Sequence, residues 1–114
     1  MLAMILAAAV AAQPALPRVD VPRLGFFAGV VHQCTPGTRK DAFDARVRSL
    51  AGEVQRQHGA DAAFDFAAAF GHGIASAAVY TSSETPLLGQ DFCGNALKTF
   101  EEGAARLEAS RRSQ

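Results

Sequence analysis

The sequence predicts a small all-α protein, a three- to four-helix bundle with one disulfide that is preceded by a cleavable signal peptide. Three observations support this fold class. Apolar residues recur at intervals of three and four along most of the chain, which is the spacing of one helix face. The chain opens with an uncharged apolar run, and its only two cysteines stand far apart. A length of 114 residues gives room for one domain.

The composition excludes several classes of protein. Eleven Lys and Arg balance eleven Asp and Glu, so the chain lacks the basic surplus of nucleic-acid-binding proteins. Apolar residues make up 49% of the chain, which excludes intrinsic disorder. Residues 18–58 carry seven basic side chains against four acidic ones, whereas residues 59–97 carry four acidic and none basic. We interpret this as a solvated helix face with pairs such as Asp44 with Arg48, and the alternative is a surface for an anionic partner.

The first 12 residues predict an exported protein. The apolar run from Met1 to Ala12 is too short to span a bilayer but fits the apolar region of a signal peptide. Val10 and Ala12 would occupy the −3 and −1 positions of the cleavage site, although no Lys or Arg precedes the run. The alternative, an alanine-rich first helix of a cytosolic protein, is disfavoured because Pro14 and Pro17 would break it.

We therefore expect a periplasmic or secreted protein that meets a membrane only during export. Its parts would be a signal peptide at residues 1–12, an extended segment at 13–20, a helical domain at 21–110 and a polar tail at 111–114.

The two cysteines, Cys34 and Cys93, predict one disulfide. They stand 59 positions apart, which excludes the paired spacing of redox motifs and zinc ribbons. An even cysteine count in a small exported protein favours an intramolecular bond. Closing a loop of this length contributes about 4 kcal/mol in the loop-entropy model. The alternative is two buried free thiols in a cytosolic core.

The first predicted helix precedes Cys34 and begins after Asp20, a plausible N-cap with Pro22 in the first turn. Cys34 continues its apolar stripe, which consists of Leu24, Phe27, Ala28 and Val31. Gly25 and Gly29 would let another helix approach closely, but they also leave a strand as an alternative for residues 25–31.

The second predicted helix is the most regular, and it ends at Gly59. Thr38 and Asp41 resemble a capping box at its start. Its apolar stripe consists of Phe43, Val47, Leu50 and Val54.

The third predicted helix follows a cap at Asp61 and is apolar on almost all sides, which predicts a buried helix. The sequence leaves open whether it kinks or divides at Gly71-His72-Gly73. A membrane span is disfavoured because Asp65 and His72 interrupt a stretch of alanine rather than leucine.

The fourth predicted helix begins near residues 86–89, after a loop from about residue 81. Its stripe consists of Phe92, Ala96, Phe100, Ala104 and Leu107, widened by Leu97. If this helix lies antiparallel to the first, Cys34 and Cys93 fall at the same end of the bundle.

A possible ligand or buried polar site comprises Asp65 and His72, which would line an internal cavity together with Tyr80 or His32. The alternative is an aspartate stabilised by the helix dipole and a histidine that donates to a backbone carbonyl. No third ligand stands at a recognisable spacing, so we expect no metal, and no motif points to a cofactor.

These observations leave three hypotheses for function. The first is an interaction module with an exposed patch, for which Phe26 and Val30 are candidates, and it requires a protein partner. The second is a carrier of a small apolar ligand in a cavity near Phe66, Phe70, His72 and Ile74. The third is an enzyme that uses Asp65 and His72, and it is disfavoured because the sequence has no recognisable catalytic motif. We expect the first.

Overall fold

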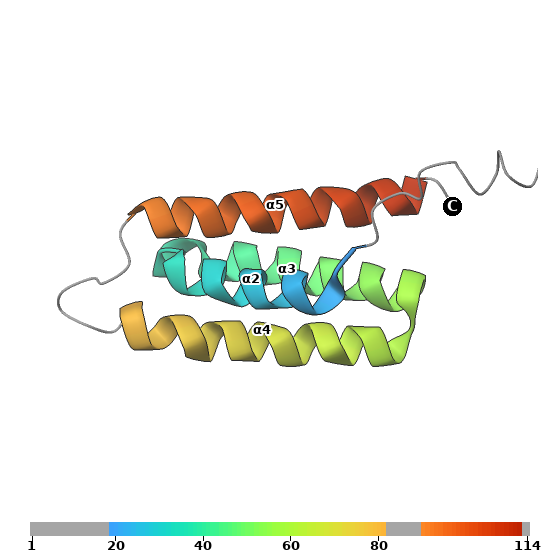
Figure 1. Ribbon diagram of the computed structural model, residues 1–114, viewed down its shortest axis with the longest axis horizontal. Helices are drawn as coiled ribbons and strands as arrows, with labels where there is room; N and C mark the ends of the chain where they lie inside the picture. The colour runs from blue at the N-terminus through green and yellow to red at the C-terminus, as the bar shows by residue number, and fades with distance from the viewer. Residues whose placement is uncertain (1–18, 82–89, 113–114) are drawn as a thin grey trace, which may run out of the picture.

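The protein is a bundle of four helices in the computed structural model, which describes residues 19–81 and 90–112, with the side chains of Tyr80, Thr81, Gln90 and Arg112 excepted (Figure 1). The helices are α2 (Val21–Cys34), α3 (Gly37–His58), α4 (Ala60–Thr81) and α5 (Gln90–Arg112). The described residues contain no strand, so the strand alternative for residues 25–31 is wrong. The predicted signal peptide and the loop predicted before α5 fall on residues outside the described ranges.

The helices surround one core in an arrangement that places α2 centrally. In Figure 1, α2 lies between α5 and α4, and α3 lies behind it. α2 packs most extensively on α4, which runs in the same direction, and it lies antiparallel to α5. α4 and α5 do not contact each other within the described ranges, because α2 and α3 separate them. This arrangement leaves one face of α4 turned away from the other helices.

Local sequence signals set several helix ends. The Asp20 side chain accepts a hydrogen bond of 3.0 Å from the backbone N–H of Arg23, which confirms it as the N-cap of α2. Gly59 has φ +98°, a conformation that favours glycine, and it separates α3 from α4. α4 begins at Ala60, so Asp61 lies inside the first turn rather than at the cap.

The core draws on all four helices, and its largest fully buried side chains are Phe66, Phe100, Leu107 and Val54. The stripes predicted for the first two helices are buried or half-buried. In α5, however, Phe92 is 40% exposed and Leu97 is 45% exposed, which corrects the prediction that they belong to the core stripe. Leu97 is exposed because it borders a groove between α3 and α5 that no helix fills.

α4 is continuous through Gly71-His72-Gly73, but it is not a buried helix. Only 17% of the apolar segment Ala60–Val79 is buried. One face, with Phe66 and Ala77, packs in the core, and the opposite face is exposed. The prediction of burial was wrong because small apolar side chains cover both faces, so composition does not reveal which face has a partner.

Glycines bring the backbones of α2 and α4 into direct contact, which confirms the close approach predicted from Gly25 and Gly29. A Cβ atom added at Gly29 would lie 2.7 Å from the backbone nitrogen of Ile74 and 2.9 Å from Cα of Gly73. A Cβ atom added at Gly73 would overlap the backbone carbonyl of Phe26. No side chain could move aside to relieve these contacts, because the neighbouring atoms belong to the backbone.

Candidate functional site

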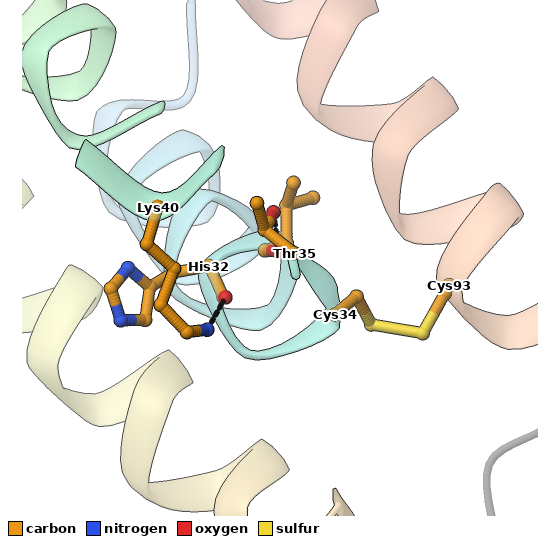
Figure 2. Close-up of a disulfide and its surroundings, with 6 residues drawn as sticks. His32, Cys34, Thr35, Lys40 and Cys93 are labelled. Carbon is orange, nitrogen blue, oxygen red and sulfur yellow. Dashed lines mark hydrogen bonds between the residues drawn. A yellow bond between two sulfur atoms is a disulfide. The ribbon is translucent and has the colours of Figure 1, made fainter. Parts of the chain in front are cut away.

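The two cysteines are joined at one end of the bundle, as the sequence predicts. Cys34 is the last residue of α2 and Cys93 lies in the first turn of α5, and a Cys34–Cys93 disulfide links their sulfur atoms with 5.8 Å between Cα atoms. Figure 2 shows this bond crossing from α2 to α5. The bond joins the C-terminal end of α2 to the N-terminal end of α5, across 59 positions of sequence.

A groove of about 550 Å³ lies beside this disulfide, between α3 and α5. Apolar side chains form its walls, chiefly Phe43 from α3, Leu97 from α5 and Val31 from α2. Both cysteines line it as well. Its charged lining residues are Arg39, Arg46 and Glu101. We name this cavity the disulfide groove.

The disulfide groove meets the N-terminal end of α3, where the predicted capping box is absent. α3 begins at Gly37 with Pro36 as N-cap, and no side chain accepts a hydrogen bond from its first turn. The capping-box prediction from Thr38 and Asp41 is therefore wrong, because the helix begins one residue before Thr38 instead of after it. The first turn contains no acidic residue, although acidic residues are favoured there.

Lysine and arginine occupy this first turn instead. Lys40 donates a hydrogen bond from Nζ to the backbone carbonyl of His32, at the C-terminal end of α2 (Figure 2). Arg39 is exposed, and its guanidinium has no partner among residues 19–81 and 90–112. Of these two basic residues, Arg39 lines the groove and Lys40 does not.

An ion pair spans the groove between α3 and α5. Both guanidinium nitrogens of Arg46 donate to the Glu101 carboxylate, one of them over 2.7 Å. Hydrogen bonding from Arg46 lowers the pKa of Glu101, and the same bond raises the pKa of Arg46. The Arg46 guanidinium also lies over the Phe100 ring, 5.1 Å from its centroid.

Replacing Glu101 with glutamine is expected to lower the free energy of unfolding by less than about 1 kcal/mol at pH 7, because both partners are partly exposed. A carboxyl group with a depressed pKa stabilises the fold above its ordinary pKa of 4.5, and that contribution is lost as the pH falls through the depressed value. Urea unfolding at pH 7 and in acid measures it. A stability difference between wild type and variant that grows on acidification would contradict this assignment.

His32 is the only residue of the predicted polar site that has a described side-chain hydrogen bond. Its Nδ1 lies 2.7 Å from Oδ1 of Asp44 on α3, and both side chains are partly buried. The His32 and Phe70 rings also form a T-shaped pair, with 5.8 Å between their centroids. Asp44 therefore pairs with His32, which corrects the expected pair with Arg48. The pair joins α2 to α3, and the spacing of the sequence did not reveal it because its members belong to different helices.

Asp65 and His72 are exposed on α4, which corrects the expectation that they are buried. Seven positions separate them, so they lie about 10 Å apart along the helix axis, too far for a hydrogen bond. The His72 ring packs against Phe26, on the opposite edge of α4 from the Phe70 ring that contacts His32. The Tyr80 side chain lies outside the described residues. The four residues do not form one site in the part of the chain that is described.

A second groove lies between α3 and α4, in the region where the sequence predicts a cavity for an apolar ligand. Phe66 and Phe70 line it, as expected for an apolar ligand, but His72 and Ile74 do not. Asp44 and Arg48 stand among its lining residues. Its volume is about 240 Å³, below the range of about 300–1,000 Å³ that is typical of small-molecule pockets. The geometry therefore favours the disulfide groove over this one as a ligand site.

The most exposed apolar surface is the outward side of α4. Phe64 is 74% exposed and Val79 is 69% exposed. The other exposed apolar residues of this surface are Ala60, Ala67, Ala68, Gly71 and Ala75. We name this set the outer face of α4. The patch expected from Phe26 and Val30 is not exposed, because Val30 is buried and Phe26 is half-buried against α4.

The outer face has acidic residues along one edge. Asp61 and Asp65 are both exposed, and α4 carries no lysine or arginine. By length and composition alone, Ala60–Val79 could span a membrane, with a mean hydropathy of 1.3. However, α2 and α3 pack against its other face, so α4 is one of the packed helices of the bundle.

No family model matches this chain, and no curated protein or solved structure is significantly similar to it. The outer face of α4 and the disulfide groove are the two surfaces with room for a partner or ligand among the features described above.

Proposed function

We propose that the protein is an exported interaction module whose outer face of α4 binds an amphipathic helix of a partner protein. The observation that carries this proposal is the exposure of Phe64 and Val79 at the two ends of an uncharged apolar stripe. Contiguous exposed apolar surface on a folded domain is typical of a binding site. The Cys34–Cys93 bond supports export, because disulfides persist in oxidising compartments.

The chemistry of the stripe favours a helical occupant. Ala67, Ala68, Gly71 and Ala75 form its centre, and a Cβ atom added at Gly71 would meet nothing within 4 Å. Small side chains would let the backbone of a partner helix lie close to α4, as Gly29 and Gly73 do on the opposite side. Phe64 and Val79 would then contact the partner on either side of this centre.

The charge along the edge favours a partner with basic residues. Asp61 and Asp65 are exposed beside the stripe and have no cation on their own helix. A partner helix with lysine or arginine next to its apolar side would complement them, and such charges mainly determine specificity and association rate. The proposed occupant is therefore an amphipathic helix with a basic flank.

Site-specific photo-crosslinking in the producing cells tests this proposal. A photoreactive residue at position 64 or at position 79 is expected to capture the same protein, whereas one at Gln55, exposed on α3, is not. The captured segment should be a helix with an apolar face and a basic flank. A synthetic peptide of that segment should bind the purified protein, and Phe64→Asp should weaken binding about tenfold or more.

Phe64→Asp should leave the melting temperature nearly unchanged, because surface substitutions change stability by about 0.5 kcal/mol or less. Two results would contradict the proposal. One is capture of unrelated proteins from positions 64 and 79. The other is binding to lipid vesicles that Phe64→Asp abolishes, since that would assign the outer face to a membrane.

A further inference from the structure

We propose that the disulfide groove binds a free fatty acid, with the alkyl chain against Phe43 and Leu97 and the carboxylate at Arg39. This site is distinct from the outer face of α4, since its lining residues come from α2, α3, α5 and the connection between α2 and α3. The inference therefore goes beyond the proposed interaction function and does not depend on it.

The size and lining of the groove suit a small apolar ligand. Its volume of about 550 Å³ falls within the range of about 300–1,000 Å³ typical of ligand pockets. Leu97 is 45% exposed and Phe43 is only partly buried, so apolar surface remains for a ligand to cover. Burial of such surface by a ligand is favourable. An extended alkyl chain could cover both side chains at once.

The charged residues that line the groove favour a ligand with one negative charge. Arg46 and Glu101 neutralise each other, so the remaining charged lining residue is Arg39. Lys40 is already bonded to the carbonyl of His32. A carboxylate is the anion that an arginine fork binds with two parallel hydrogen bonds. The groove therefore complements an apolar body with one anionic end.

The backbone at the mouth of the groove adds to this preference. The first turn of α3 begins beside the groove at Pro36 and has no side-chain cap. Helix N-termini carry a partial positive charge and point free N–H groups outward. Arg39 and this turn therefore present positive potential at the same end of an apolar groove. Glu101 is the one carboxylate that lines the groove in the described part of the chain, and Asp41 and Asp91 are exposed and do not line it.

Fluorescence titration of the oxidised protein with cis-parinaric acid, followed by displacement with palmitate, tests the inference. We expect saturable binding of both acids and much weaker displacement by hexadecanol, which has the same chain without the charge. Arg39→Glu should weaken palmitate binding about tenfold or more, the loss expected for a charged hydrogen bond. Leu97→Glu should also weaken palmitate binding, because it replaces an apolar side chain that lines the groove and leaves Arg39 in place.

Arg48→Glu is the matched control, because Arg48 is an exposed arginine of the same helix that lines the α3–α4 groove instead. It should leave palmitate binding within about twofold of wild type. Phe64→Asp should also leave palmitate binding unchanged, because Phe64 does not line the groove. A negative result for palmitate therefore leaves the proposed role of the outer face of α4 standing, and the reverse also holds. No saturable palmitate binding, equal displacement by hexadecanol, or a larger effect of Arg48→Glu than of Arg39→Glu would overturn the inference. Circular dichroism confirms that each variant is folded.

Discussion

Replacing Gly29 with alanine is expected to destabilise the protein by about 3 kcal/mol and to lower its melting temperature by about 10 °C or more. The added methyl group would overlap the backbone of α4 at Phe70 and Ile74, and it would lie against Gly73. Since these atoms are backbone, α2 and α4 could relieve the overlap only by moving apart along their whole contact. Thermal unfolding followed by circular dichroism measures the effect.

Gly52→Ala provides the control for helix propensity. Gly52 is exposed on α3, and a Cβ atom there would meet nothing within 4 Å. Alanine is favoured over glycine inside a helix by about 1 kcal/mol, so this variant should be slightly more stable than wild type. If Gly29→Ala were also stabilising, α2 and α4 would not be in backbone contact, and the described packing would be wrong.

Removal of the disulfide is expected to have the other large effect. The double variant Cys34→Ser with Cys93→Ser should lose about 4 kcal/mol of unfolding free energy, because the bond closes a long loop in the unfolded chain. This loss is comparable to the whole stability of many small domains, which is about 5–15 kcal/mol. Urea unfolding of the variant and of wild type, with and without a reductant, measures it.

Reduced wild type should match the double variant, and the reductant should not change the variant itself. A double variant within about 1 kcal/mol of oxidised wild type would show that the bond does not constrain the unfolded chain as proposed. Equal unfolding free energies of oxidised and reduced wild type would also show that the bond does not stabilise the protein, and this comparison needs no substitution.

Much of the fold could be predicted because its signals are local. Asp20 caps the start of α2, Gly59 follows the end of α3, and the apolar stripes follow the helix period. The Cys34–Cys93 pair could also be predicted, because two helices of opposite direction bring both residues to one end of the bundle. The glycine spacing in α2 indicated close packing but not the identity of the neighbouring helix.

The errors concern contacts between distant parts of the chain. α4 is apolar on nearly all sides, so its composition predicted burial, but only the fold determines that one side is left uncovered. The pairing of Asp44 with His32 and of Arg46 with Glu101 depends on how three helices are placed. The capping box failed because Gly37 and Thr38 already lie inside α3.

The site could be predicted less well than the fold for the same reason. Asp65 and His72 interrupt an apolar segment, which predicted that they are buried, but both are exposed. The disulfide groove draws its lining from three helices and the connection after α2, so no stretch of sequence contains its pattern. The one local signal was the pair of basic residues Arg39 and Lys40 in a first helical turn, where acidic residues are favoured.

We propose that this chain is exported and oxidised before it binds its partner or ligand. Intact-mass spectrometry of the protein produced from its full sequence in a bacterium, and recovered from the periplasm or medium, tests it most directly. We predict a chain that begins at Gln13 and gains two hydrogen masses on reduction. A protein that retains Met1, stays in the cytosol and carries two free thiols would contradict the claim.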